Sequence, residues 1–352
     1  MKKKGFVFIL VFILFASGSQ FIGSACTTFC VNSSQVFYGK NWDFDTSRKG
    51  DVVISLNEVA PDLASLNFRL SSSGFLCSAI NSAGFYVTCN EDSGVGGEFD
   101  DSYAKNAVDI AALREKSVEF TDISDVKDYI GNKNVTCFGY NEHVFFADRN
   151  GNSCLVETDN KKTYITDGKD GFLVTTNFPL YTLSAPDDLE QVYCYRYKNA
   201  YTEIKNNFET FDLDEAIETL KCSVQPDYTI YSFIYSAKEN AVYLFLNQDF
   251  EKIWKISFAE KNIIAWRGFE KVVQIALDER GVLFTDLETF QNTGTLPGKN
   301  QTNRPSTEPH GANPLPFLKY KIIMIGAVVF LAAVTLTVLL VYNFGRKRNQ
   351  KP

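Results

Sequence analysis

The sequence predicts an α+β domain, and three observations support this fold class. Patterns typical of strands occur near both ends of a long region, and helical patterns lie between them. The chain also holds 30 Phe and 17 Tyr, enough for a core between packed layers. The strand patterns lie at 26–45, 74–91, 145–157 and 229–247, and the helical patterns at 101–116, 122–131, 189–208 and 212–223.

The first 25 residues have the pattern of a cleaved signal peptide. A basic opening, MKKKG, is followed by the apolar run FVFILVFILFA, and GSA places small residues at −3 and −1 of a cut between Ala25 and Cys26. An uncleaved anchor is the alternative. Cleavage here would make Cys26 the first residue of the mature chain.

The other end predicts a stalk, a membrane span and a tail. The polar, Pro- and Gly-rich stretch 291–318 is typical of a flexible stalk. The uncharged apolar run 322–344 is long enough to cross a bilayer, for which about 20 residues suffice, although a buried soluble helix is the alternative. The basic segment 345–352 predicts a cytoplasmic tail. We therefore expect an ectodomain at 26–290, anchored outside the cell membrane by a single span.

The charge and the glycosylation sequons say little more about partners. The net charge is −7, which argues against nucleic acid because phosphate binding needs a basic surface. Sequons occur at Asn32, Asn134 and Asn300, and they matter only in a host that glycosylates.

All eight cysteines lie at or after the cleavage site, so a disulfide-permissive compartment is expected. If Cys26 is reserved for chemistry, seven remain, and an odd number cannot all pair within one chain. The segment 74–91 predicts a hairpin that turns at 82–84 and brings Cys77 opposite Cys89. The two either form a disulfide or remain buried thiols.

A free N-terminal cysteine carries a thiol and a primary α-amine on one residue. The reference pKa values are about 8.5 for a thiol and about 7.7–8.0 for an α-amine, so the amine can accept the thiol proton and later donate it. The chain has only two histidines, and His310 lies in the stalk, so a Cys-His pair would depend on His143. The alternatives for Cys26 are a disulfide partner or a lipid-modified cysteine.

The next element predicts a carboxylate near this N-terminus. The segment 26–45 has the pattern of strand, turn and strand, with the turn in NSSQ. If Val31 pairs with Val36, Cys26 lies opposite Asn41, and Asp43 follows on the same face. Asp43 could then hold the α-amine; a surface turn is the alternative.

These residues resemble the choloylglycine hydrolase and penicillin V acylase-like branch of the N-terminal nucleophile hydrolases, which act on linear amides. Members begin with Cys and carry Gly-Arg-(Asn/Thr)-x-Asp one hairpin later, which here reads GKNWD at 39–43. The Asp is kept as Asp43, but Lys40 replaces the Arg and lacks its planar fork. In a regular strand the two would face opposite sides, so both can serve the site only if the strand ends or bulges between them.

The resemblance implies further site residues. Asn90, at the end of the 74–91 hairpin, takes the role of an oxyanion-hole Asn, and a turn cap is the alternative. Asn177, in VTTNFP, takes the role of a second such Asn, because an uncharged amide can donate to developing negative charge. Arg196 matches an Arg near the nucleophile more loosely, and a polar helix face is the alternative.

The resemblance also implies the fold and the reaction. It implies a four-layer αββα sandwich and a hydrolase that forms a thioester on Cys26, with no cofactor and no metal. The expected partner is a small-molecule N-acyl amide, lipid-like or bile-salt-like. An acyltransferase and a catalytically silent binding module that keeps the fold remain alternatives, and the Lys at position 40 favours the silent module.

Overall fold

The computed structural model describes residues 26–91, 103, 105–137 and 141–297. Four predicted parts of the chain lie outside these residues: the signal peptide, the membrane span, the tail and most of the stalk. Among the residues that the structure describes, no helix is both long and apolar enough to span a membrane.

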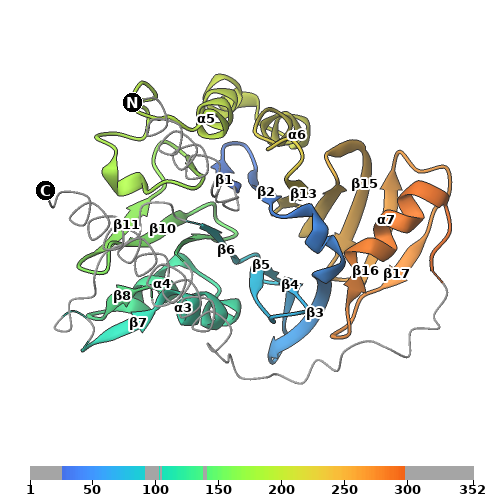
Figure 1. Cartoon of the computed structure of the whole chain (residues 1–352), viewed down its shortest axis with the longest axis horizontal. Coiled ribbons are helices and arrows are strands. Elements are labelled where there is room, and N and C mark those ends of the chain that lie inside the picture. The colour runs from blue at the N-terminus through green and yellow to red at the C-terminus, as the bar shows by residue number, and fades with distance from the viewer. Residues whose placement is uncertain (1–25, 92–102, 104, 138–140, 298–352) are drawn as a thin grey trace, which may run out of the picture. The chain divides into compact units, whose positions relative to one another are not determined.

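Two eight-stranded antiparallel sheets form the centre of the domain (Figure 1). Sheet A has the order β12 (Phe172–Thr175), β1 (Thr27–Asn32), β2 (Val36–Asp43), β13 (Thr229–Ser236), β14 (Ala241–Leu246), β15 (Asp249–Ser257), β16 (Asn262–Arg267) and β17 (Gln274–Ala276). Sheet B has the order β11 (Thr163–Asp167), β10 (Ser153–Thr158), β9 (Glu142–Ala147), β6 (Tyr86–Glu91), β5 (Leu76–Asn81), β4 (Leu63–Leu70), β3 (Val52–Ala60) and β18 (Val282–Leu283). Both strands of the N-terminal hairpin therefore lie inside sheet A, each with a neighbouring strand on either side.

Helices cover the outer face of each sheet. Helices α5 (Tyr195–Asn207) and α6 (Leu213–Cys222) pack on β1, β2, β12 and β13 of sheet A. Helices α3 (Ile110–Lys116) and α4 (Ile123–Ile130) share a second apolar core with the outer face of sheet B. The mixed sandwich agrees with the predicted α+β class and with the αββα order of layers.

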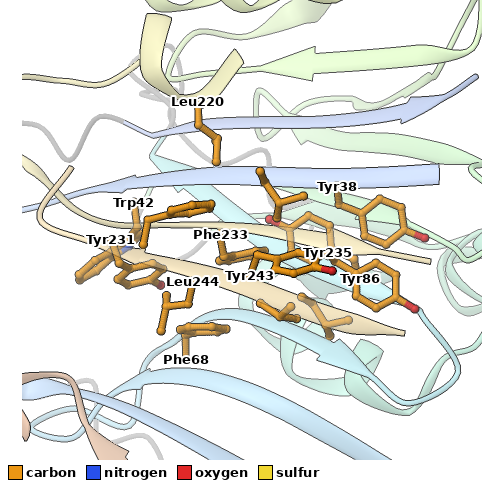
Figure 2. Packing of buried hydrophobic residues seen from close by; sticks show 14 of the residues in the cluster. Tyr38, Trp42, Phe68, Tyr86, Leu220, Tyr231, Phe233, Tyr235, Tyr243 and Leu244 are labelled. Atoms are coloured by element: carbon orange, nitrogen blue, oxygen red, sulfur yellow. The ribbon is translucent and has the colours of Figure 1, made fainter. Parts of the chain in front are cut away.

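Stacked aromatic rings hold the inner faces of the two sheets together (Figure 2). Tyr38 of β2 stacks on Tyr86 of β6 with ring centroids 5.6 Å apart, and Phe68 of β4 lies 5.1 Å from Tyr231 of β13. Such pairs add about 0.5–1.5 kcal/mol beyond their buried area. The first pair fixes the distance between β2 and β6, the strands that carry Lys40 and Asn90.

The predicted hairpins and helices are mostly confirmed. The turns after β5 and β9 contain Gly84 and Gly151, whose φ angles of 85° and 82° favour glycine. Helices α4 and α6 each begin at a capping box, on Asp122 and Asp212. The helix expected over 101–116 is wrong at 107–109, which form a strand.

That helix begins late because strand β7 (Ala107–Asp109) pairs in parallel with β8 (Asn134–Thr136). The Asp109 carboxylate then accepts hydrogen bonds from the backbone N–H groups of Ala111 and Ala112, which starts α3. Helix α5 likewise begins six residues after 189, at Tyr195. At the end of the domain, α7 (Phe284–Thr293) crosses the expected boundary at 290.

The expected register of the N-terminal hairpin is wrong by one residue. Asn32 pairs with Val36 and Thr27 with Asn41, so Cys26 lies opposite Trp42 rather than Asn41. The loop has three residues instead of four, and a slip of one residue exchanges the two faces of a strand. Thr27 and Asp43 consequently face helices α5 and α6, whereas the Cys26 side chain shares the face toward sheet B.

Of the two alternatives for Cys77 and Cys89, a disulfide or two buried thiols, the structure has the buried thiols. A register shift between β4 and β5 near Cys77 turns its side chain into the core between the sheets. Cys89 points into the other core, beneath α3 and α4. Opposite directions prevent the two sulfur atoms from meeting.

Candidate active site

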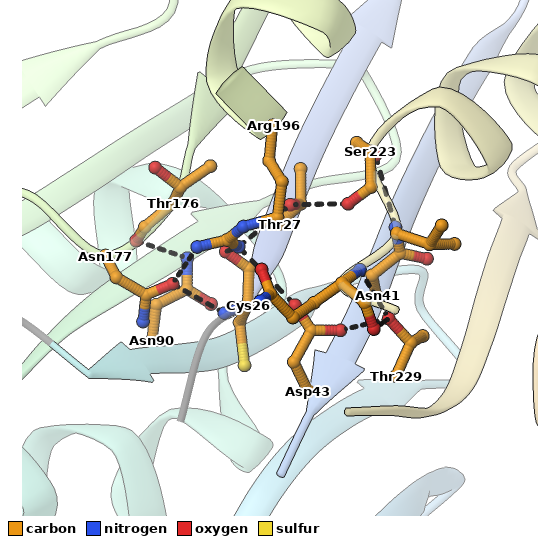
Figure 3. Close-up of polar contacts among 12 residues, drawn as sticks. Cys26, Thr27, Asn41, Asp43, Asn90, Thr176, Asn177, Arg196, Ser223 and Thr229 are labelled. Atoms are coloured by element: carbon orange, nitrogen blue, oxygen red, sulfur yellow. Dashed lines mark hydrogen bonds and ion pairs between the residues drawn. The ribbon is translucent and has the colours of Figure 1, made fainter. Parts of the chain in front are cut away.

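The structure brings the predicted site residues together at one end of the N-terminal hairpin, and Figure 3 labels all of them except Lys40. Their positions lie just before β1, within β2, at the end of β6, just after β12 and in the first turn of α5. The residues are Cys26, Lys40, Asp43, Asn90, Asn177 and Arg196. Segments far apart in the sequence therefore converge on the residue that follows the predicted cleavage site.

Both backbone polar atoms of Cys26 are held by side chains. Its N–H donates to Asn177 Oδ1 at 2.6 Å, and its carbonyl oxygen accepts from Arg196 Nη1 at 2.6 Å. The residue is only 2% exposed. In the full chain this nitrogen belongs to the peptide bond with Ala25, and cleavage there would make it the α-amine. The sequence had indicated Asp43 as the partner of this nitrogen, but the partner is Asn177.

Asn177 presents its oxygen, rather than its N–H, to the Cys26 nitrogen. Its Oδ1 also accepts from Arg196 Nη2 at 3.0 Å, and its Nδ2 donates to the Glu91 carbonyl oxygen at 2.8 Å. These bonds fix the direction of the amide group. The arrangement suits the binding of an amine, whereas the predicted oxyanion role requires an N–H directed at the substrate.

Asp43 lies on the helix side of sheet A and is completely buried. Its carboxylate accepts from Thr229 Oγ1 and lies 3.4 Å from Arg196 Nη1. Burial raises the pKa of the Asp43 carboxyl to about 7, although Arg196 and the Thr229 hydroxyl act in the opposite direction. The carboxyl group can therefore change its charge near neutral pH.

Lys40 lies on the other face of β2 and reaches sheet B. Its Nζ donates to the Cys89 carbonyl oxygen and to Asn90 Oδ1, both at 2.9 Å. Asn90 Nδ2 then donates to the Thr176 carbonyl oxygen at 3.1 Å. Lys40 thereby fixes which end of the Asn90 amide points toward the segment that carries Asn177.

Lys40 and Asp43 face opposite sides of the strand, as regular alternation predicts, yet both act on the electrostatics of Cys26. Burial raises the pKa of the Cys26 thiol, and the Lys40 cation is the strongest influence that lowers it. The charge of the Asp43 carboxylate raises the pKa of the Cys26 thiol, whereas the backbone N–H of Asp43 and the Arg196 cation lower it. Strand β2 ends at Asp43, and its pairing with β13 shifts register beside that residue. Because strand β2 ends beside Cys26, groups on both of its faces can act on the Cys26 thiol.

Several residues that support the site were missed in the sequence. Thr27 Oγ1 donates to the Ser223 carbonyl oxygen at 3.3 Å, and Asn41 Nδ2 donates to the Leu220 carbonyl oxygen at 2.9 Å. These bonds attach the C-terminal end of α6 to the N-terminal hairpin. Asn41 lies within the GKNWD motif and could have been found there, whereas Ser223 and Thr229 follow α6 without any local signal.

His143 does not provide a base for Cys26, because both of its ring nitrogens are engaged elsewhere. Nε2 lies 2.7 Å from the Thr176 carbonyl oxygen, and Nδ1 lies 3.3 Å from Glu157 Oε1. Within the described part of the chain, no cluster of three His, Cys, Asp or Glu side chains is arranged to hold a metal ion.

Comparisons with known proteins support the fold. No protein-family model matches the sequence, and no curated protein matches it. Among solved structures, a mutant of the conjugated bile acid hydrolase from Clostridium perfringens matches with a TM-score of 0.50 and 14% identity, over 72% of this chain and 97% of that one. Penicillin V acylase from Agrobacterium tumefaciens matches with a TM-score of 0.52 and 13% identity, over 72% of this chain and 96% of that one. The chain therefore has the fold expected from the choloylglycine hydrolase resemblance, and at these identities the likeness concerns the fold alone.

Proposed function

We propose that this chain is an extracytoplasmic amidase that hydrolyses a linear N-acyl amide with Cys26 as its N-terminal nucleophile. Two hydrogen bonds to the backbone of Cys26 carry the proposal: its nitrogen donates to Asn177, and its carbonyl oxygen accepts from Arg196. A buried residue at the predicted start of the mature chain, with its nitrogen directed at an acceptor, is arranged for self-contained acid–base chemistry.

The reaction begins when cleavage after Ala25 turns the Cys26 nitrogen into an α-amine. This amine takes the proton from Sγ, and the thiolate attacks the carbonyl carbon of the substrate amide. The oxyanion that forms accepts hydrogen bonds from the side chain of Asn90 and from backbone N–H groups. The C–N bond then breaks as the α-ammonium returns its proton to the leaving amine. Water finally hydrolyses the thioester and restores the thiol.

Arg196 supports the amine in its neutral form. The Cys26 nitrogen and Arg196 Nη2 donate to the same oxygen, Asn177 Oδ1, at 2.6 Å and 3.0 Å. A guanidinium so near disfavours a second positive charge on the nitrogen. The neutral amine is the form that can accept the thiol proton, so the shared acceptor assigns Asn177 to holding the base and Arg196 to adjusting its charge.

The proposal includes a location and a substrate class. We expect the 322–344 segment to anchor the domain in the cell membrane, with the tail at 345–352 in the cytoplasm. Two of the solved structures that match this fold are named as a conjugated bile acid hydrolase and a penicillin V acylase. Both names refer to small-molecule amides as substrates. This supports an N-acyl amide, lipid-like or bile-salt-like, as the substrate here.

The test combines the mature N-terminus with turnover. The intact mass of the purified native chain should show a start at unmodified Cys26. Release of amine is then measured over a panel of N-acyl substrates for the wild type, Cys26→Ser and Cys26→Ala. We expect loss of turnover in Cys26→Ala, and unchanged turnover in that variant would end the proposal. A native start before Cys26, or a lipid on its sulfur, would instead support a silent binding module.

A further inference from the structure

A row of three buried polar side chains crosses sheet B beside the site. Asn90 of β6 pairs in register with His143 of β9. Val144 pairs with Val156, which brings Glu157 of β10 opposite His143. All three members of the row, Asn90, His143 and Glu157, are at most 1% exposed. Because Lys40 of sheet A reaches Asn90, the row faces the space between the sheets.

The row binds the backbone of one segment, 175–181, at two points. The Thr176 carbonyl oxygen accepts from Asn90 Nδ2 at 3.1 Å and lies 2.7 Å from His143 Nε2. The Glu157 carboxylate accepts from the backbone N–H of Leu180 at 2.8 Å and from that of Tyr181 at 3.1 Å. The residues between these two points include Asn177.

The hydrogen bonds define which atoms of the row donate and which accept. A carbonyl oxygen can only accept, so His143 Nε2 must carry a proton to bind Thr176. Glu157 accepts one backbone N–H bond on each of its two oxygens. His143 Nδ1 lies 3.3 Å from Glu157 Oε1, so the two side chains form a buried polar pair.

We propose that His143 and Glu157 are positioning residues, which hold the 175–181 segment so that Asn177 meets the Cys26 nitrogen. The inference rests on the proposed function, in which that nitrogen is the base. A buried polar pair of this kind contributes little to stability, because desolvation offsets the attraction between its members. Its two bonds to backbone N–H groups and its bond to a carbonyl oxygen instead fix the path of the chain on both sides of Asn177.

The chain offers a matched control on the same strand. Glu142 precedes His143 and points to the outer face of sheet B, where it forms a buried ion pair with Arg114. Glu142 is 1% exposed, as buried as Glu157. Glu142→Gln therefore removes an equally buried charge without touching the bonds to 175–181. Comparison with Glu157→Gln separates positioning from a general loss of stability.

The first experiment measures kcat, KM and hydrogen–deuterium exchange for the processed full-length chain. We expect Glu157→Gln to lower kcat by about 10- to 100-fold with KM nearly unchanged, since small displacements near reacting groups have effects of this size. Exchange in the peptide that covers 175–181 should become faster. Glu142→Gln should leave kcat and the exchange rate of the 175–181 peptide at their wild-type values. Equal losses in the two variants, or unchanged exchange in Glu157→Gln, would overturn the inference.

A second pair of variants addresses His143 and also serves if Glu157→Gln does not fold. His143→Gln keeps an N–H donor for the Thr176 carbonyl oxygen, whereas His143→Leu has none. We expect His143→Gln to retain more turnover and slower exchange, and equal behaviour would contradict the inference. If the wild type itself shows no Cys26-dependent turnover, the proposed function fails; the exchange data still decide whether the pair holds the segment.

Discussion

Replacement of Asp43 by Asn tests the electrostatics of the site directly. Asp43 is completely buried, and its nearest partners are Thr229 and Arg196. Burial raises the pKa of its carboxyl from 3.8 to about 7. Asn has nearly the same shape but cannot ionise. The variant therefore isolates the free energy that ionisation of this one group contributes to folding.

The size of the effect follows from the shift. The folded state binds this proton more tightly than the unfolded chain, so unfolding becomes easier as the pH rises between the two pKa values. A shift from 3.8 to about 7 corresponds to about 4 kcal/mol, at roughly 1.4 kcal/mol per pH unit. The side chain at position 43 cannot ionise in the Asp43→Asn variant, so the variant lacks this pH-dependent contribution to the free energy of unfolding. Relative to the wild type, the variant should gain about 4 kcal/mol between about pH 4 and pH 7.5.

Urea unfolding at a series of pH values measures this difference, with tryptophan fluorescence as the signal, because Trp42 and Trp254 are buried. Subtracting the two curves removes every titration that the proteins share. Asp45→Asn is the control, because this exposed carboxyl has a lowered pKa and should not change the slope above pH 5. Parallel curves for wild type and Asp43→Asn would refute the reasoning. A wild type that gains stability over Asp43→Asn with rising pH would show that Arg196 outweighs burial.

Three further predictions follow from the same contacts. Asn177→Ala should lower kcat by on the order of 10²-fold, because Asn177 holds the α-amine and a positioned general base contributes about 10²–10⁴ in rate; a change below about threefold in steady-state turnover would exclude the assigned role. Lys40→Met should move the pH midpoint of Cys26 alkylation by iodoacetamide upward, since the Lys40 cation lowers the pKa of that thiol, and an unmoved midpoint would contradict this. Cys77 and Cys89 should both be alkylated in denatured, unreduced protein, as measured by peptide mass spectrometry, and protection of the pair would show a disulfide.

The sequence was informative where chemistry is local. A cysteine after a cleavage motif, followed by GKNWD, indicated Cys26 and Asp43, and the two lie together in the structure. The partner of the Cys26 nitrogen was not predictable in this way. It depends on hairpin register, and the loop residues Ser33 to Gln35 lack the Asn-Gly or Asp-Gly signal that would have fixed the turn. The register expected from the sequence differs by one residue from the observed one, and this error placed Asp43 on the same face as the Cys26 side chain, whereas the two face opposite sides of sheet A.

Long-range pairing explains the other omissions. Glu157 lies in a predicted strand region and His143 lies just before it, but their common target is the 175–181 segment, which begins at the end of β12 in the other sheet. Nothing near either residue in the sequence indicates that segment. The available signal was Glu157 itself, because a glutamate inside a predicted strand needs a partner when it is buried.

The site concentrates positive charge before any substrate arrives. Lys40 is completely buried, and both of its hydrogen-bond acceptors among the described residues are neutral carbonyl oxygens. Arg196 adds a second cation, and Asp43, with a pKa of about 7, offsets at most one of the two. Such an arrangement is unfavourable around a neutral thiol. It becomes favourable once a thiolate or an oxyanion forms, which is the condition for stabilising a transition state more than a ground state. The replacement of Arg by Lys in the motif therefore preserves the property that this chemistry needs, a buried cation beside the nucleophile, and it argues for a working site over a silent one.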